Sequence, residues 1–235
     1  MNERDVPSHP SAAPCRMFRL ALCAIVLLIP LMAGAADVFR PQELADQTRV
    51  ILQTFATDAE MTQSLQGLAS DIKALFVLPE FLRWGFIVGG AGGEGLLIVR
   101  DEKSGQWSQP VFYHVGSMNL GPQVGVDVSE ILIVVRTQKG LEEFYGTGFK
   151  LGTGASVAAG AKGSSKIGVG SDMVAYARRK GAFAGIALGG ALITVAGDLN
   201  RSYYGRPVEP REIVQGEVTN RRSVALRDAA GSLIK

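Results

Sequence analysis

The chain has 235 residues, of which 47% are hydrophobic and 20% are charged, and its formal net charge at pH 7 is only +2. This near balance excludes the strong overall positive field that drives non-specific binding to nucleic acid. The two cysteines are Cys15 and Cys23. Because no cysteine follows Cys23, the rest of the chain cannot form disulfides, use a catalytic thiolate or bind a metal through cysteine.

The first 36 residues have the pattern of a secretory signal peptide. Arg16 and Arg19 precede an uncharged apolar stretch over residues 20–32, and small residues at 33–35 follow it as a cleavage site. The apolar stretch is shorter than the run of about 20 residues that a membrane-spanning helix needs. We therefore predict export to the periplasm, with Met17 as an alternative start of the signal.

Residues 37–76 have helical periodicity, with apolar side chains recurring every three or four residues. The pattern predicts two amphipathic helices, or one helix bent near Thr57, with Asp58 as the N-cap of the second set. The predicted apolar face consists of Leu44, Ile51, Leu52, Phe55, Met61, Leu65, Leu68 and Ile72. Two uses remain open for this face, insertion into a membrane or cover for a sheet. The second is the expected one, because a curved sheet must bury one face.

After Trp84 the period changes to two. Residues 122–128 place Val124, Val126 and Val128 on one face, as in a half-buried strand. Further strand-like runs are residues 86–88, 96–100, 111–114 and 131–136, and the stretches around Ser156, Tyr176, Phe183 and Ile193. We predict an α+β fold over residues 77–215, a β-dominated curved antiparallel sheet or partial barrel with the N-terminal amphipathic helices packed on it. Short helices are expected within 137–145 and 207–214, and a frayed helix or disorder in the tail over 216–235.

Glycines are concentrated where the first strands should lie. The structural glycines are Gly85, Gly89, Gly90, Gly92, Gly93 and Gly95, and residues 90–95 fit G-x-G-x-x-G. A dinucleotide site would need a helix to follow, but residues 96–99 continue as a strand, so we interpret the stretch as a glycine bend. Glycines inside strands would mark bulges, bends or close backbone approach.

A second glycine-rich stretch covers residues 181–197 and is uncharged. Its G-x-x-x-G spacing allows a glycine-zipper membrane helix as an alternative. Five glycines lower its helix propensity, and Gly189-Gly190 would divide it into two strands, so a hairpin is favoured.

The sequence beyond the signal lacks the phosphate-loop and nucleophile-elbow motifs. Residues 154–165 lack the Gly-Lys-Ser/Thr of a phosphate loop, and G-x-S-x-G does not occur. His114, the sole histidine there, rules out a multi-histidine metal site and is expected to be a sheet residue with satisfied partners. We predict a protein that is not an enzyme and uses no cofactor or metal. A hydrolase of unrecognised type is the alternative.

Several stretches together resemble the SYLF domain family. They are GFIVGGAGGEGLLIVR from Gly85, Trp107-Ser108-x-Pro110, Gly121-x-Gln123-x-Gly125, FKLGTGASVAAG from Phe149, YARRKGAFAG from Tyr176 and Asn200-Arg201-x-Tyr203-Tyr204-Gly205, and the resemblance covers about residues 71–214. It implies lipid binding, notably to phosphoinositides in eukaryotic members with help from an N-terminal amphipathic helix, and actin binding in some members. Residues 40–73 hold three basic and five acidic residues, which departs from a basic phosphoinositide-binding helix. Anionic phospholipids of the envelope are therefore the expected target.

The charges are unevenly distributed. Residues 37–161 contain nine Lys or Arg against fourteen Asp or Glu, whereas residues 162–235 contain twelve against six. Each cation near an anionic membrane adds about 1 kcal/mol of attraction. The candidate lipid-binding residues are Lys162, Lys166, Arg178, Arg179, Lys180, Arg201 and Arg206. These residues predict a periplasmic, peripherally membrane-associated lipid-binding protein, without a nucleic-acid partner. An envelope protein-interaction or scaffold module is the alternative.

Overall fold

The computed structural model describes residues 40–85, 88–120, 125–159, 170–179, 182–184 and 190–234. The signal peptide expected over residues 1–36 lies outside this part of the chain and stays a prediction.

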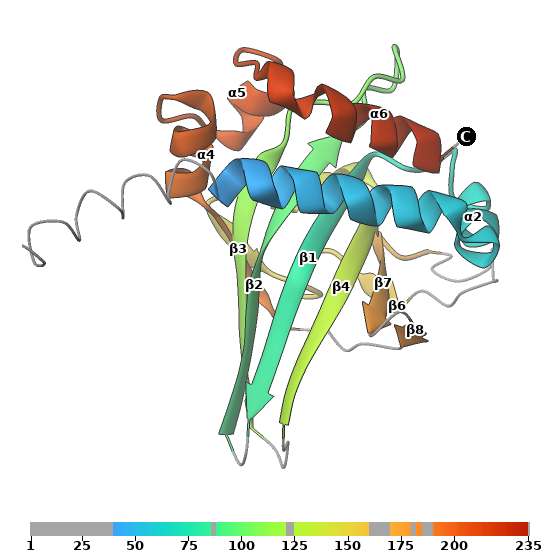
Figure 1. The fold of residues 1–235 in the computed structure, drawn as a ribbon, viewed down its shortest axis with the longest axis vertical. Helices are drawn as coiled ribbons and strands as arrows, with labels where there is room; N and C mark the ends of the chain where they lie inside the picture. The colour runs from blue at the N-terminus through green and yellow to red at the C-terminus, as the bar shows by residue number, and fades with distance from the viewer. Residues whose placement is uncertain are drawn as a thin grey trace, which may run out of the picture. The chain divides into compact units, whose positions relative to one another are not determined.

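Two helices open the described chain, one over residues 40–57 and α2 over Ala59–Gln66. The Asp58 side chain accepts a hydrogen bond from the Met61 backbone N–H at 3.0 Å, which confirms the predicted N-cap and the break beside Thr57. All eight residues of the predicted apolar face are buried, and none is more than 6% exposed. Their apolar face covers the sheet, as expected (Figure 1).

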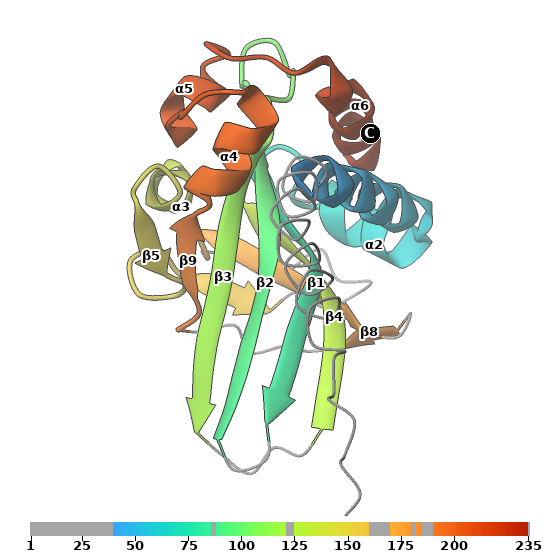
Figure 2. The ribbon, with the colours of Figure 1, turned by 60° about the vertical axis from the view of Figure 1, so that its left-hand side comes forward.

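The described strands form one nine-stranded sheet, in the order β5-β9-β3-β2-β1-β4-β7-β6, with β8 also paired to β7. Their bounds are β1 Ala74–Gly85, β2 Val88–Val99, β3 Val111–Leu120, β4 Gly125–Val135, β5 Gly148–Lys150, β6 Val157–Ala159, β7 Met173–Arg179, β8 Ala182–Ala184 and β9 Leu192–Val195. Every pair is antiparallel except β6 with β7, which is parallel. The sheet is curled (Figure 2), which confirms the predicted α+β class with a β-dominated curved sheet.

The central strand β1 begins at Ala74, where a helix was predicted to continue to residue 76. Its first residues are buried on both faces, so their sequence lacks the alternation that reveals a half-buried strand. Pro79 has no N–H to donate to a neighbouring strand. The pairing of β1 shifts register with β4 between Leu78 and Phe81, so Pro79 lies in a bulge, where a proline is tolerated.

The glycine-rich stretch is part of β2, a continuous strand, so the predicted glycine bend is wrong. All six predicted structural glycines lie in β1 or β2. The alternative reason for glycine, close backbone approach, is confirmed at Gly93. A Cβ built there would stand 2.2 Å from the Glu80 carbonyl oxygen at the β1 bulge. The strands can lie this close only because residue 93 has no side chain.

Apolar side chains are buried on both faces of the sheet. One cluster joins the sheet to the 40–57 helix, α2, α4 (Gly197–Tyr204) and α6 (Val224–Leu233). The other joins it to α3 (Gln138–Glu143) and α5 (Pro210–Val214). Helix α3 lies within residues 137–145, where a short helix was predicted, and Thr137 caps it, since its hydroxyl oxygen accepts from the Gly140 N–H at 3.1 Å.

Three elements in the last quarter of the chain differ from expectation. Strands β8 and β9 do not form the predicted hairpin: β8 pairs with β7, and β9 lies between β3 and β5. Among the described residues, no helix has the length and apolar character to cross a bilayer. After a short 3-10 turn over Arg221–Ser223, α6 packs Leu226 and Leu233 into the core, so this part of the tail is not frayed.

Candidate functional site

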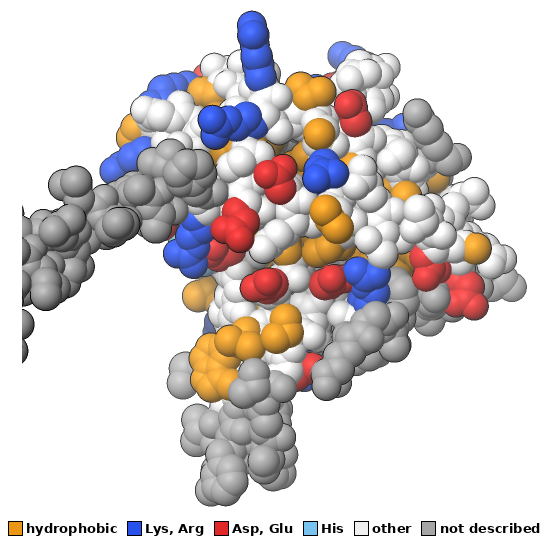
Figure 3. Space-filling view, in the orientation of Figure 1, with side chains coloured by type: hydrophobic (Ala, Val, Ile, Leu, Met, Phe, Trp, Pro, Cys, Tyr) orange, Lys and Arg blue, Asp and Glu red, His pale blue; other side chains and the backbone are white. Residues whose placement is uncertain are grey.

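Strands β1 to β4 extend beyond the helices (Figure 1), and side chains exposed at this end of the sheet form an apolar patch. The patch consists of Leu82, Trp84 and Val128, whose exposed fractions are 40%, 48% and 48%. Leu82 and Trp84 are two residues apart on β1, and Leu82 pairs with Val128 of β4, so the three side chains share one face. Figure 3 shows hydrophobic side chains gathered toward the lower end of this face.

The sequence explains why this end of the sheet is flat and apolar. The Trp84 ring lies over Gly90, its partner on β2, where a Cβ would stand 2.8 Å from the ring atom Cζ2. No Lys, Arg, Asp or Glu occurs in residues 85–93 or 115–126. Large exposed apolar side chains in an uncharged setting are typical of a surface that binds another molecule or a membrane.

A groove of about 450 Å³ adjoins the patch, between the 40–57 helix and the sheet. Leu82 and Trp84 line one part of it, and Glu80, Glu94 and Arg40 supply charges. Glu80 is exposed, and we find no hydrogen bond or ion pair to its carboxylate from the described residues. The groove thus presents one guanidinium and two carboxylates beside an aromatic ring.

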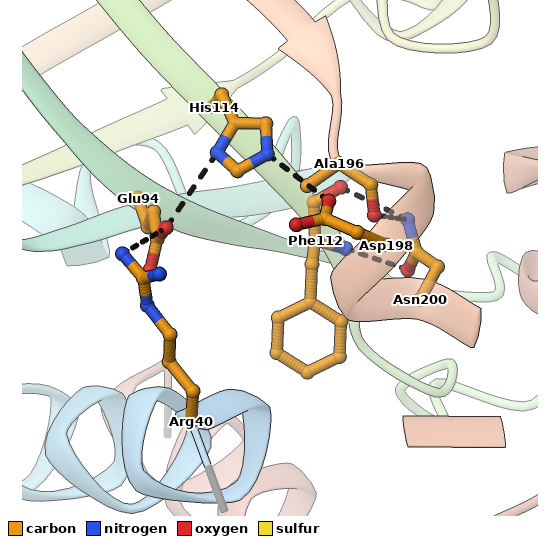
Figure 4. A network of polar contacts seen from close by, with 7 residues as sticks. All are labelled: Arg40, Glu94, Phe112, His114, Ala196, Asp198 and Asn200. Carbon is orange, nitrogen blue, oxygen red and sulfur yellow. Dashed lines mark hydrogen bonds and ion pairs between the residues drawn. The ribbon is translucent and has the colours of Figure 1, made fainter. Parts of the chain in front are cut away.

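The charged side of the groove belongs to a chain of polar contacts (Figure 4). Arg40 Nη2 lies 2.6 Å from Glu94 Oε1, and His114 Nδ1 lies 3.6 Å from the same oxygen. On its other side, His114 Nε2 lies 3.1 Å from Asp198 Oδ1 at the start of α4. His114 is therefore a sheet residue with partners, as predicted.

The environment of Asp198 favours its charged form. Desolvation acts to raise the pKa of this carboxyl, but hydrogen bonds from His114 and from the Leu199 backbone N–H outweigh it, and the pKa lies below its usual value. The position in the first turn of α4 also stabilises a negative charge. Asp198 thus adds a third carboxylate near the groove.

The predicted cationic residues are not brought together on one face. Arg178 is half-buried, forms an ion pair with Glu130 and lies 5.3 Å from the centre of the Phe55 ring. The side chain of Arg179, and the whole of Lys162, Lys166 and Lys180, lie outside the described residues.

The other two predicted cations lie on a different part of the sheet. Arg201 is exposed on α4, and Arg206 follows α4 and donates to Glu212 Oε2 at 3.2 Å. Helix α4 contacts β3, which is four strand spacings, or about 19 Å along the sheet, from β7. The prediction that Arg178, Arg201 and Arg206 form one basic patch is therefore wrong.

Sequence reasoning missed the apolar patch. The predicted strand is confirmed from Gly125, where β4 begins, but the valine face was expected to be buried, and Val128 is exposed. Residues 122–124 lie outside the described part of the chain. Trp84 and Leu82 had no predicted role in binding. The signal that could have found them is the absence of charged residues from two separate stretches of the chain, residues 85–93 and 115–126.

The motifs that carry the family resemblance have structural roles instead. The Asn200 side chain is fully buried and bonds to the Phe112 backbone, the Tyr204 hydroxyl donates to the Pro110 carbonyl at 2.6 Å, and Ser108 Oγ accepts from the Val99 N–H at 3.0 Å. These residues fasten α4 and the loop before β3 to the sheet.

Fold and site together define an α+β domain with a curved sheet, an apolar patch at one end of the sheet and a charged groove beside it. A family model described as "Ysc84: Las17-binding protein actin regulator" matches residues 116–233. The chain belongs to this family, whose domain is the SYLF domain, and the resemblance seen in the sequence is confirmed.

Similar proteins come from yeasts and mammals. An SH3 domain-containing protein, PJ696.02 of Schizosaccharomyces pombe, is 31% identical over 150 residues, covering 60% of this chain and 35% of the relative. LAS seventeen-binding protein 3 of Saccharomyces cerevisiae is 28% identical over 194 residues, covering 76% of this chain and 42% of the relative. The human SH3 domain-containing YSC84-like protein 1 is 27% identical over 151 residues, covering 62% of this chain and 44% of the relative. The chain spans less than half the length of these curated relatives, and the names of the family and of the second relative describe binding proteins.

Proposed function

We propose that this chain is a non-enzymatic, exported protein that docks peripherally on phospholipid membranes in the periplasm, with the apolar patch at the end of its sheet facing the bilayer. The observation that carries the proposal is the exposure of Leu82, Trp84 and Val128 together on one face of that end. Tryptophan favours the boundary between headgroups and acyl chains, because its ring is apolar and its N–H is polar.

The energetics fit a reversible contact. A fully buried large apolar side chain gains about 1.5–3 kcal/mol, so three half-exposed ones would gain about 2–4 kcal/mol on entering the interface. Apolar contact of this size gives weak attachment. A charge contribution is therefore part of the proposal.

Anionic headgroups are the proposed source of that contribution. The cations proposed for it are Arg179, the last residue of β7, and Lys180, the next residue in the sequence, and each would add about 1 kcal/mol near an anionic surface. Arg178 is left out of this set because Glu130 already neutralises it.

Sedimentation with vesicles tests the proposal. We expect binding to rise with the fraction of phosphatidylglycerol and to fall with salt, since the charge contribution is screened. Trp84→Ser should weaken binding about fivefold, because it removes one half-exposed side chain whose entry into the interface is worth about 1 kcal/mol. Val224→Ser is the matched control, since Val224 is equally exposed (52%) but lies at the start of α6. Equal binding of Trp84→Ser and the wild type would refute the assigned surface.

A second candidate is a protein-interaction module of the envelope, favoured by the family description, which names Las17 binding. Partner proteins also use exposed tryptophans as anchors in their interfaces. Indifference of the wild-type chain to vesicles of every composition would favour this second function over the first.

A further inference from the structure

We propose that the groove beside Trp84 binds the headgroup of an ethanolamine phospholipid. This proposal rests on the membrane docking proposed above and names the lipid that the docked protein would recognise. The groove adjoins the apolar patch without interruption, because Leu82 and Trp84 belong to both. A headgroup in the groove would therefore leave its acyl chains on the side of the patch.

The charges of the groove match a zwitterion. Glu80 offers an exposed carboxylate, with no partner among the described residues, to an ammonium group. The Arg40 guanidinium, whose side chain is 57% exposed despite its contact with Glu94, offers N–H donors to a phosphate. The groove has a volume of about 450 Å³, which is that of a site for a small ligand or headgroup.

The same charges discriminate against other headgroups. Glu80, Glu94 and the nearby Asp198 would repel an anionic glycerol headgroup that has no ammonium to offer. A choline headgroup carries a positive charge that Trp84 can attract, but it has no N–H to donate to a carboxylate. Of the glycerol, choline and ethanolamine headgroups, ethanolamine alone has a primary ammonium, which gives Glu80 both a charge and a hydrogen bond.

Vesicle binding by the full chain tests this specificity. Two vesicle types are compared at one fixed fraction of phosphatidylglycerol, with the remainder phosphatidylcholine in one and phosphatidylethanolamine in the other. We expect about tenfold tighter binding to the ethanolamine vesicles, the ratio expected from one charge-assisted hydrogen bond. Glu80→Gln should abolish this ratio. Glu43→Gln, which changes an exposed carboxylate of the neighbouring helix outside the groove, should preserve it.

Fluorescence of the wild-type chain gives a readout that does not depend on a variant. Trp107 is only 4% exposed, so protection from an aqueous quencher reports mainly on Trp84. Protection should be greater on ethanolamine vesicles than on choline vesicles. Equal binding and equal protection on both would overturn the headgroup assignment while leaving membrane docking intact. Failure to bind either vesicle would instead overturn the docking on which it rests.

Discussion

Replacing Asn200 by alanine should destabilise the domain strongly, because this side chain completes the edge of β3. Strand β9 pairs with β3 only from Tyr113 to Gly116. Phe112, the next residue of β3, turns instead to Asn200 of α4 (Figure 4). Its N–H donates to Asn200 Oδ1 at 3.0 Å, and Asn200 Nδ2 donates to the carbonyls of Phe112 and Ala196 at 3.1 and 3.0 Å.

The magnitude follows from what each group keeps after the substitution. The Phe112 carbonyl still accepts from the Ala196 N–H, and the Ala196 carbonyl still accepts from the Asn200 N–H. The Phe112 N–H alone would be left buried without a partner, at a cost of about 1–3 kcal/mol. With two further hydrogen bonds lost, each worth about 0.5–1 kcal/mol, the free energy of unfolding should fall by about 3 kcal/mol.

Urea unfolding followed by circular dichroism measures this loss. For a slope of about 2 kcal/mol per molar, the midpoint should fall by roughly 1.5 M. Arg201→Ala, at the exposed neighbouring position of α4, should change the free energy of unfolding by no more than about 0.5 kcal/mol. A loss below about 1 kcal/mol for Asn200→Ala would refute the reasoning, because the Phe112 N–H would then have found another partner.

Two further predictions concern the strands and an acidic side chain. Gly93→Ala should lower the free energy of unfolding by about 2 kcal/mol in the same urea assay, because the added Cβ would meet the Glu80 carbonyl oxygen. Gly116→Ala is the control and should be close to neutral, because the space around Gly116 is open. The pKa of Asp172 is lowered to about 2, first by a hydrogen bond from the Thr137 hydroxyl. Its contribution to stability is complete above the unfolded-state pKa of about 4 and should be lost as the pH falls from 4 to 2; an NMR titration giving an Asp172 pKa near 4 would contradict this.

The N-terminal helices could be predicted because local signals agree there. Apolar residues recur every three or four positions, and Asp58 stands where a cap is needed. The resulting face, including Leu52 and Phe55, is fully buried against the sheet. A pattern of this kind predicts which side chains of a helix are buried, and no knowledge of distant residues is required to predict a helix that covers a sheet.

The strand β1 could not be predicted in this way, because its environment is set by distant parts of the chain. Helices cover one face of its first half and α3 covers the other, so apolar residues occur without alternation. Pro79 then reads as an end of structure, although a bulge accommodates it. Periodicity reports local exposure, and it is silent where both faces are buried.

The candidate site shows the same limit from the opposite direction. Arg178, Arg179 and Lys180 are consecutive in sequence, but Glu130 on β4 forms an ion pair with Arg178. This partner lies 48 positions away in the sequence. A run of cations in the sequence therefore does not show which of them are free to bind an anion.

The bare end of the sheet has a further consequence for how the module works. The apolar faces of the 40–57 helix and α2 are buried in the core. Insertion of those helices into a membrane would have to remove Leu52, Phe55 and Met61, all fully buried, from their packing against the sheet. At about 1.5–3 kcal/mol for each side chain, that exposure would cost a large share of the stability of a typical domain. Docking through Leu82, Trp84 and Val128 requires no such opening, because those side chains are already exposed. The helices thus close the core while the ends of the strands stay exposed, and the proposed membrane docking would need no unfolding of the described domain.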